Sequence, residues 1–379
     1  MKITNIQLLP ADKYLFLKVY TDEGVEGIGE IGIWGYLDAA AAVIEKVKKY
    51  LIGENPLRIE HIWQYLYRCL YFRGSVIMSA LSAIDIALWD IKGKYLGVPV
   101  YELLGGLCRD RVRTYAPVFR YTSDEMAQGC IELKEKGFTA ARLILPDLSA
   151  PSHMEAPVIY AKKVADDIEK IRRCREAVGD DFDLCIEVHR SMTVSEAIAF
   201  ARGVEQYHPY FIEDPIAPDN VAVMAQIAAT TSIPITTGER AINLQELEVL
   251  VSSHAARYIR PDVCAVGGIT VAKKAAAIAE AYYVGIVPHN PLGPVSTAAC
   301  LQLDAAIPNF AIQEFPSFNV DGSENRMTKN PLQVENGHIL IPSAPGIGIE
   351  LADDILERFP ANPRDLTAVI GYDGAVIDR

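Results

Sequence analysis

Residues 182–189 read FDLCIEVH, a short apolar run that ends in a carboxylate and an imidazole. The same order, an apolar run followed by an acidic residue, returns at 210–214, YFIED, and at 234–239, PITTGE. The carboxylates Glu187, Glu213 and Glu239 follow one another at intervals of roughly 25 residues, about the length of one strand and one helix in a barrel. These stretches predict parallel strands that are joined by helices and that end in acidic residues.

Apolar runs of this kind recur eight times, at residues 112–116, 140–145, 182–188, 210–212, 234–237, 258–259, 285–287 and 310–312. Helical periodicity separates them, as at 123–136, 158–178 and 193–207. Eight strands with intervening helices predict an α/β protein whose main unit is a (β/α)7β TIM-like barrel. We place this catalytic domain at residues 112–345.

Residues 1–111 have a different order of elements. Strand patterns at 3–9, 14–20 and 27–31 come first, and helical patterns at 39–51, 59–70 and 78–95 follow. Strands followed by helices predict a separate α+β domain. We expect residues 346–379 to return to this domain as a tail, so that both ends of the chain build a cap on the barrel.

The composition limits the partners of the protein. A formal net charge of −13 argues against nucleic acid, because an acidic protein repels polyphosphate. No stretch approaches the roughly 18 apolar residues of a membrane span. The seven cysteines form no CxxC pair, which argues against a disulfide framework. We therefore expect a cytoplasmic protein whose partner is a small molecule, with no nucleic acid and no membrane.

Ionisable side chains directly after apolar strands are unfavourable to bury unless they are paired or bind a metal. The carboxyl ends of barrel strands meet at one mouth, so Glu187, Glu213 and Glu239 should converge there. An all-oxygen ligand set favours Mg²⁺. A single acidic residue after a strand is more often a helix cap or a surface ion-pair partner, but three at matched spacing favour a metal site. Of the seven histidines, His189 and His289 follow predicted strands.

Several longer motifs make the sequence similar to a known family. They are ALSAIDIALWDIKGK at 80–94 with LLGG at 103–106, EDP at 213–215, GER at 238–240, PD at 261–262 and GGIT at 267–270. With these motifs the whole chain resembles the enolase superfamily, in its mandelate racemase/muconate lactonizing enzyme branch. EVH at 187–189, HNPLGP at 289–294 and PGIGIE at 345–350 are similar to the acid-sugar dehydratases of that branch, especially the galactonate type.

The resemblance implies a role for each strand-end residue. Glu187, Glu213 and Glu239 would bind Mg²⁺, which holds the substrate carboxylate and stabilises an enediolate. His289 would be the base, oriented by Asp262. His189 would be the acid that helps the 3-hydroxyl leave, and Glu314 would hydrogen-bond the carboxylate side of the enediolate. A sugar acid would thus become a 2-keto-3-deoxy acid, and the family commonly forms homo-oligomers.

The sequence also departs from the family. The first metal ligand is commonly Asp, whereas here it is Glu187. Many relatives carry a Lys-x-Lys base after the second strand, where this chain reads ARLI at 141–144. The missing lysine argues against a racemase with two opposed bases. Some mannonate dehydratases have an arginine at the position that Arg142 resembles, and Arg142 is a candidate for binding the substrate. Their accompanying tyrosine is not identifiable at 146–155, so mannonate chemistry stays open.

Residues 32–36, GIWGY, resemble the mobile loop with which the family closes over its substrate. Trp34 and Tyr36 are therefore candidates for binding the sugar end of the substrate. An equal alternative is that both side chains only pack within the capping domain. Other functions also stay open. An epimerase, racemase or cycloisomerase would use the same metal and His–Asp dyad, and a silent barrel would serve only as a binding or structural protein.

Overall fold

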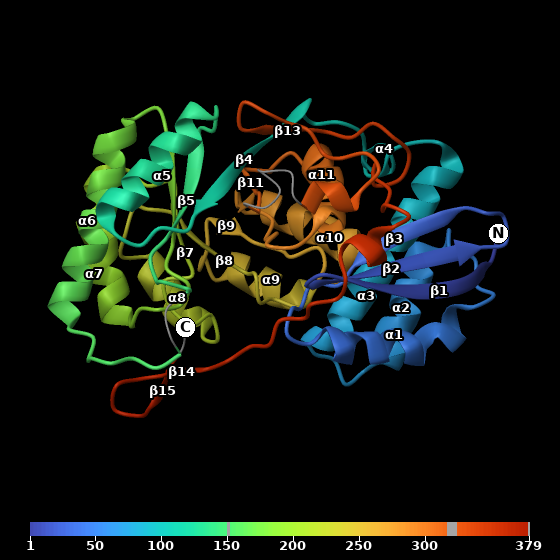
Figure 1. Cartoon of the computed structure of the whole chain (residues 1–379), viewed down its shortest axis with the longest axis horizontal. Coiled ribbons are helices and arrows are strands. Elements are labelled where there is room, and N and C mark those ends of the chain that lie inside the picture. The colour runs from blue at the N-terminus through green and yellow to red at the C-terminus, as the bar shows by residue number, and fades with distance from the viewer. Residues whose placement is uncertain (150–151, 317–323, 378–379) are drawn as a thin grey trace.

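A computed structural model describes residues 1–149, 152–316 and 324–377 of the chain. Figure 1 shows a barrel of strands ringed by helices on one side and a smaller layer of strands and helices on the other. Among the described residues, none of the helices combines the length and the apolar character that crossing a membrane requires.

The smaller layer is an antiparallel sheet packed on helices. Its strands β1 (Ile3–Ala11), β2 (Tyr14–Thr21) and β3 (Glu26–Glu30) lie in the order β1-β2-β3. Four helices follow: α1 (Leu37–Leu51), α2 (Ile59–Cys69), α3 (Ser75–Leu96) and α4 (Val100–Leu103). α3 is apolar around most of its circumference because it is buried on several sides.

Two glycines let α3 lie directly on β3. A Cβ atom at Gly29 would be 2.0 Å from the carbonyl oxygen of Ala83, and one at Gly27 would be 2.1 Å from that of Ala87. Any larger residue at these positions would push the helix away from the sheet.

The barrel consists of eight short parallel strands. They are β4 (Arg111–Val118), β5 (Ala140–Ile144), β6 (Asp183–Glu187), β7 (Phe211–Glu213), β8 (Ile235–Thr237), β9 (Tyr258–Ile259), β10 (Gly285–Ile286) and β11 (Gln313–Glu314). Each of β4 to β9 pairs with the next strand in the chain, and β11 pairs with β4. A parallel bridge between Ile286 and Phe310 joins β10 to the segment that leads into β11, which completes the circuit.

Seven helices connect the barrel strands on the outside. They are α5 (Ser123–Glu135), α6 (Tyr160–Val178), α7 (Val194–Val204), α8 (Val221–Ala228), α9 (Leu244–Ser252), α10 (Gly268–Ala281) and α11 (Pro294–Ala306). The predicted (β/α)7β class with an α+β cap is thus confirmed.

The eighth strand differs from its prediction. The apolar run 310–312 was the expected strand, whereas β11 is Gln313–Glu314. Phe310 bridges to Ile286 on one side, and Gln313 and Glu314 pair with Thr114 and Tyr115 on the other. The segment therefore lies against β10 at its start and against β4 at its end. The polar residues Gln313 and Glu314 form the regular strand because they pair with β4 where the barrel closes.

The sequence patterns also missed a hairpin. β12 (Val334–Glu335) and β13 (His338–Leu340) pair with each other, and β13 pairs antiparallel with the start of β4. Both strands are too short to produce a visible alternation. The hairpin lies at the end of the barrel where its strands begin.

The tail beyond residue 345 contacts both parts of the molecule. Gly346 bridges to Pro99, and the Ile347 N–H donates to Asp90 in α3. After α13 (Ile355–Arg358) the chain leaves the cap and ends in the hairpin β14 (Val369–Ile370) and β15 (Val376–Ile377), which Figure 1 shows beside the barrel. Residues 378–379 of the expected tail lie outside the described part, and the domain boundaries at 111 and 345 stay predictions.

The close packing of α3 on β3 predicts an effect on stability. Gly29→Ala should lower the free energy of unfolding by about 1–3 kcal/mol, because the new methyl group overlaps Ala83. Urea unfolding measures this change. Gly74→Ala is the matched control, since Gly74 has extended backbone and nothing within 4 Å of an added Cβ. Equal losses in both variants would contradict the packing argument.

Candidate active site

Three carboxylates meet at the mouth of the barrel. Glu187 and Glu213 end β6 and β7 and are paired in register, and Glu239 follows β8 by two residues. One oxygen from each of the three side chains lies within 4.8 Å of the others. The matched spacing in the sequence thus leads to convergence in space, because each carboxylate follows its own strand.

Two buried arginines neutralise much of this negative charge. Arg142, on β5, donates to Glu187 Oε2 at 2.5 Å and to Glu314 Oε1 at 2.6 Å. Arg260, directly after β9, lies with Nε 2.8 Å from Glu213 Oε1 and with Nη2 2.5 Å from Glu314 Oε2. Removing one partner of such a buried pair typically costs about 3–5 kcal/mol. Each arginine therefore holds the barrel mouth together as well as balancing its charge.

The pKa values of Glu187 and Glu213 are shifted in opposite directions. Burial raises the pKa of Glu187, but the charge of Arg142 outweighs burial and lowers that pKa to about 2. Burial also raises the pKa of Glu213. The charge of Arg260 acts in the opposite direction but does not outweigh burial, so the pKa of Glu213 stays raised. Glu213 therefore retains a proton more readily than Glu187.

The triad fits a divalent cation. Its donors are all carboxylate oxygens, the ligand type that Mg²⁺ prefers. Both oxygens of Glu213 are buried, and neither accepts a well-directed hydrogen bond from the described residues. A cation between the three oxygens would place positive charge beside Glu213 and would therefore favour the ionised form of that carboxyl group.

A histidine–aspartate pair lies next to the triad. His289 Nδ1 is 2.8 Å from Asp262 Oδ2, and His289 Nε2 is 3.4 Å from Glu239 Oε2. Asp262 is itself fixed by the N–H of Cys264, which donates to Oδ1 at 2.7 Å. Burial lowers the pKa of His289, but Glu239 and Asp262 outweigh it and the pKa is raised. The pair thus has one ring nitrogen tethered and the other directed toward the triad.

His189 and the adjacent Arg190 have left-handed backbone, with φ of 51° and 66°. Such conformations cost of order 1–3 kcal/mol each, so other contacts must hold them. The His189 N–H donates to Glu187 at 2.5 Å, and the Arg190 N–H donates to the Asp214 carbonyl at 2.8 Å. Burial lowers the pKa of His189. The strained turn therefore fixes His189 beside the first carboxylate of the triad.

Glu314, at the end of β11, is anchored to the barrel wall. It accepts hydrogen bonds from Arg142 and Arg260 and from the Asn290 N–H, the last at 2.8 Å. Burial raises its pKa, but the two arginines outweigh burial and lower it to about 2. Glu314 thus links Arg142 of β5 and Arg260, which follows β9, to the segment that carries His289.

The cap contributes one aromatic side chain to the mouth. The ring of Trp34 lies 6.2 Å from that of His289, at an interplanar angle of 40°. Tyr36 lies at the start of α1 and is 52% exposed. The structure therefore brings Trp34 to the predicted site, whereas no contact between Tyr36 and the strand-end residues is described.

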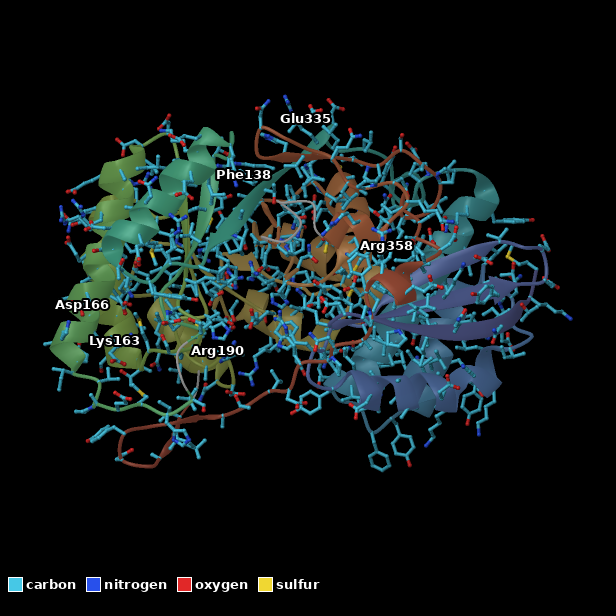
Figure 2. All side chains as sticks on the ribbon, viewed as in Figure 1. Phe138, Lys163, Asp166, Arg190, Glu335 and Arg358 are labelled. Atoms are coloured by element: carbon cyan, nitrogen blue, oxygen red, sulfur yellow. The ribbon has the colours of Figure 1, made fainter. Side chains whose placement is uncertain are left out.

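Sequence reasoning did not assign Arg190 or Arg260. Arg190 Nη1 lies 2.9 Å from Glu239, and Figure 2 shows Arg190 on the side of the barrel nearest the C-terminal tail. Arg260 is completely buried. A charged residue immediately after an apolar strand was the available signal for Arg260. Arg190 gave none, because a residue after a histidine in a predicted loop is ordinarily a surface residue.

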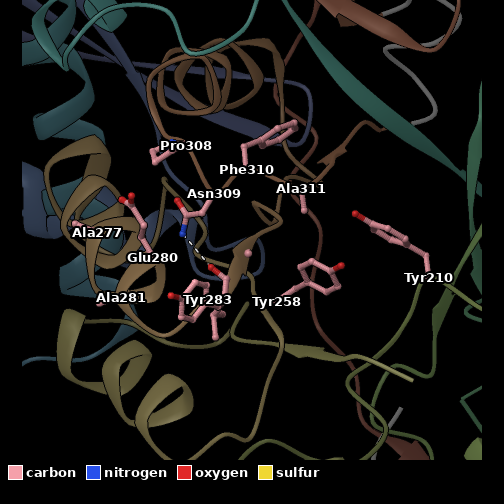
Figure 3. A pocket seen from close by; sticks show the side chains of 12 residues that line it. Tyr210, Tyr258, Ala277, Glu280, Ala281, Tyr283, Pro308, Asn309, Phe310 and Ala311 are labelled. Carbon is pink, nitrogen blue, oxygen red and sulfur yellow. Dashed lines mark hydrogen bonds between the residues drawn. The ribbon is translucent and has the colours of Figure 1, made fainter. Parts of the chain in front are cut away.

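A hollow of about 930 Å³ lies at the opposite end of the barrel. Figure 3 shows Tyr210, Tyr258 and Phe310 around it. These residues lie where barrel strands begin, and the triad lies where they end. The size of a hollow therefore does not identify the site in this molecule. The ionisable side chains at the barrel mouth identify the candidate active site instead.

Two family descriptions together match most of the chain. Residues 4–105 match "Mandelate racemase / muconate lactonizing enzyme, N-terminal domain", and residues 125–355 match "Enolase C-terminal domain-like". The chain belongs to the enolase superfamily. The predicted family and the prediction of an enzyme are thus confirmed.

Known relatives of this superfamily member cover nearly its whole length. D-galactonate dehydratase of Xanthomonas oryzae pv. oryzae is 37% identical over 96% of this chain and 96% of its own. D-galactonate dehydratase of Pectobacterium atrosepticum is 36% identical over 100% of this chain and 99% of its own.

The fold is likewise similar to solved structures of the superfamily. A member from Salmonella Typhimurium has a TM-score of 0.89 and 30% identity, over 95% of this chain and 98% of that chain. An enolase from Agrobacterium radiobacter with bound Na and L-malate has a TM-score of 0.90 and 29% identity, over 99% of each chain.

The geometry of the His–Asp pair predicts the direction of a titration. Asp262→Asn should lower the pKa of His289, because the neutral amide no longer stabilises the imidazolium that a carboxylate favours. His289 should then lose its proton at a lower pH than in the parent protein. NMR titration of the histidine ring protons measures this shift. Asp166→Asn, on the exposed face of α6, is the control, and an unchanged or raised pKa in Asp262→Asn would contradict the pairing.

Proposed function

We propose that this enolase superfamily member is a Mg²⁺-dependent sugar-acid dehydratase. It would remove the proton next to the carboxylate of an aldonate such as galactonate, eliminate the 3-hydroxyl and give a 2-keto-3-deoxy acid. The observation that carries the proposal is the buried His289–Asp262 pair facing the triad of Glu187, Glu213 and Glu239. The names of the relatives support the same reaction.

Glu187, Glu213 and Glu239 would hold the metal ion. When bound, the ion supplies positive charge beside the substrate carboxylate, which makes the neighbouring C–H more acidic. The rest of the reaction depends on side chains of the protein.

His289 would take the proton from C2. Asp262 holds Nδ1, so Nε2 is the nitrogen that remains to accept a proton. The carboxylate also stabilises the imidazolium that results. Glu239 lies 3.4 Å from Nε2, which keeps the accepting nitrogen at the edge of the proposed metal site.

His189 would act as the acid for the leaving group. Hydroxide is a poor leaving group, so the bond from C3 to oxygen breaks more easily when the oxygen gains a proton. The electrons of the C2–H bond form the C2–C3 double bond, water leaves, and the enol then becomes the 2-keto acid. The position of His189 beside Glu187 supports a role next to the metal-bound part of the substrate.

Arg142 and the cap would bind the substrate. Once the cation takes part of the charge of Glu187, the Arg142 guanidinium would become available to a substrate oxygen. Glu314 would hydrogen-bond the carboxylate side of the enediolate, and it would have to take up a proton to do so. Trp34 and Tyr36 would enclose the sugar end, and the contact of Trp34 with His289 supports the first of them more strongly.

An epimerase or cycloisomerase would use the same metal and dyad. A two-base epimerase needs a second base opposite His289, and β5 offers Arg142 there in place of a lysine. Burial lowers the pKa of Arg142, but three carboxylates outweigh it and raise that pKa above its ordinary value, so Arg142 keeps its proton at neutral pH and cannot act as a base. This weighs against epimerisation, and the buried charges at the mouth weigh against a silent barrel. Cytoplasmic location and homo-oligomerisation remain predictions.

The experiment that tests the proposal is a substrate screen. Aldonic, aldaric and uronic acids are incubated with the purified protein and Mg²⁺, and keto acids are detected with semicarbazide. We expect keto-acid formation from galactonate or a stereoisomer, its loss on chelation and its return with added Mg²⁺. Full activity in protein shown to be metal-free would overturn the metal assignment, and epimerised product without keto acid would favour the rival reaction.

His189→Asn separates the acid from the base. The variant should lose dehydration by about 10²- to 10⁴-fold, while exchange of the α-proton with solvent deuterium should fall much less. Mass spectrometry of recovered substrate measures the exchange, and His289→Asn is the comparison that should lose both. If dehydration and exchange fell equally in His189→Asn, this histidine would not act on the leaving group.

A further inference from the structure

The C-terminal strap, residues 359–377, crosses from the cap to the barrel. On the cap, the Asp12 N–H donates to the Phe359 carbonyl at 3.0 Å, and the Asn362 N–H donates to the Asp12 carbonyl at 2.7 Å. On the barrel, the Ile370 N–H donates to the Ser152 carbonyl at 2.7 Å, and the Met154 N–H donates to the Ile370 carbonyl at 2.9 Å. The strap is thus tied at both ends to different parts of the molecule, and Figure 1 shows it running between them.

Its middle touches the loop that carries Trp34. The side chain of Leu366 lies so close to Gly35 that a Cβ atom there would be 2.6 Å from Leu366 Cγ. Gly35 has a φ of 83°, so glycine is favoured by its backbone as well as by the leucine above it. The Gly35 neighbour Trp34 is the cap residue that contacts the His289 ring.

The other anchor of the strap lies on the loop between β5 and α6. Ser152 and Met154 belong to that loop, and β5 is the strand that presents Arg142. Both loops held by the strap therefore border the barrel mouth, one from the cap and one from the barrel.

The strap has little stability of its own. Residues 360–368 are exposed and form no helix or strand. Ordering a residue costs about 1–2 kcal/mol of conformational entropy, so the position of this stretch depends on the contacts at its two ends and at Leu366. Val369 is the one residue of the hairpin β14–β15 that is buried, and Leu366 remains 57% exposed. A segment held at its ends and at one point between them can release or hold the loop beneath it.

We propose that the C-terminal strap positions the substrate-closing loop, and that Leu366 is the residue through which it acts. Leu366 presses on Gly35 and so holds Trp34 over His289, while the pairing of Ile370 with Ser152 fixes the strap to the barrel. This inference rests on the proposed function for its kinetic consequence, but not for its structural one. Leu366 is a positioning residue and would not touch the substrate.

Leu366→Ala and Ile370→Pro test the two contacts separately. The first removes the side chain over Gly35, and the second removes the N–H that donates to Ser152. Leu356→Ala is the matched control, because Leu356 is a partly exposed leucine of α13 that lies outside the strap. Leu366→Met should rescue the first variant.

The first readout needs no substrate. Acrylamide quenching of Trp34 is obtained as the difference between each protein and the same protein carrying Trp34→Phe. The Trp34 side chain is already 38% exposed, so we expect its quenching to rise by no more than about two- to threefold in Leu366→Ala and Ile370→Pro. It should stay unchanged in Leu356→Ala and Leu366→Met. Unchanged quenching in both strap variants, with circular dichroism showing that they are folded, would overturn the proposal whatever the enzyme catalyses.

The second readout is the split between KM and kcat on the aldonate found by the screen. Loss of the leucine should raise KM severalfold, because the loop that carries Trp34 is no longer held over the site, with a smaller change in kcat. A fall in kcat at constant KM would overturn the positioning role. Absence of any turnover in the parent protein would refute the proposed function instead, and the quenching result would still decide whether the strap holds Trp34.

Discussion

The burial of several carboxylates at the mouth of one barrel is the constraint on which the rest of the structure depends. Glu187, Glu213 and Glu314 are almost inaccessible to water, and isolated buried carboxylates would be strongly destabilising. Arg142 and Arg260 make their burial possible by supplying charge from neighbouring strands. The same dry surroundings strengthen every electrostatic interaction at the site, because the local dielectric constant is low.

The cap keeps that mouth covered through a polar seam with the barrel. Ser79 of α3 donates to the Cys264 carbonyl, Ser82 accepts from the Gly267 N–H, and Asp85 accepts from Thr270. Ser79 also accepts from the Gly32 N–H at the start of the Trp34 loop. One helix therefore fixes both the segment that follows Asp262 and the loop above it. The relative position of base and cap loop follows from this seam.

Several features could be predicted from the chain alone because they depend on local order. The apolar runs and helical patterns gave seven of the barrel strands within a few residues, and strand-end carboxylates at equal spacing had to meet if the strands were parallel. Arg190 and the left-handed turn at His189 could not be predicted, since tertiary contacts hold them against local backbone preference. The strap gave no pattern either, because its contacts lie far away in sequence.

The sequence by itself determined the order of the elements, the type of ligand atoms and the side of the barrel on which they gather. Periodicity and residue type carry that information, and neighbouring strands transmit it directly. Only the tertiary structure decided which arginine balances which carboxylate, that Trp34 rather than Tyr36 reaches His289, and that Leu366 covers Gly35. These outcomes depend on distances between residues that are remote in the chain, and packing fixes such distances only when the whole molecule has folded.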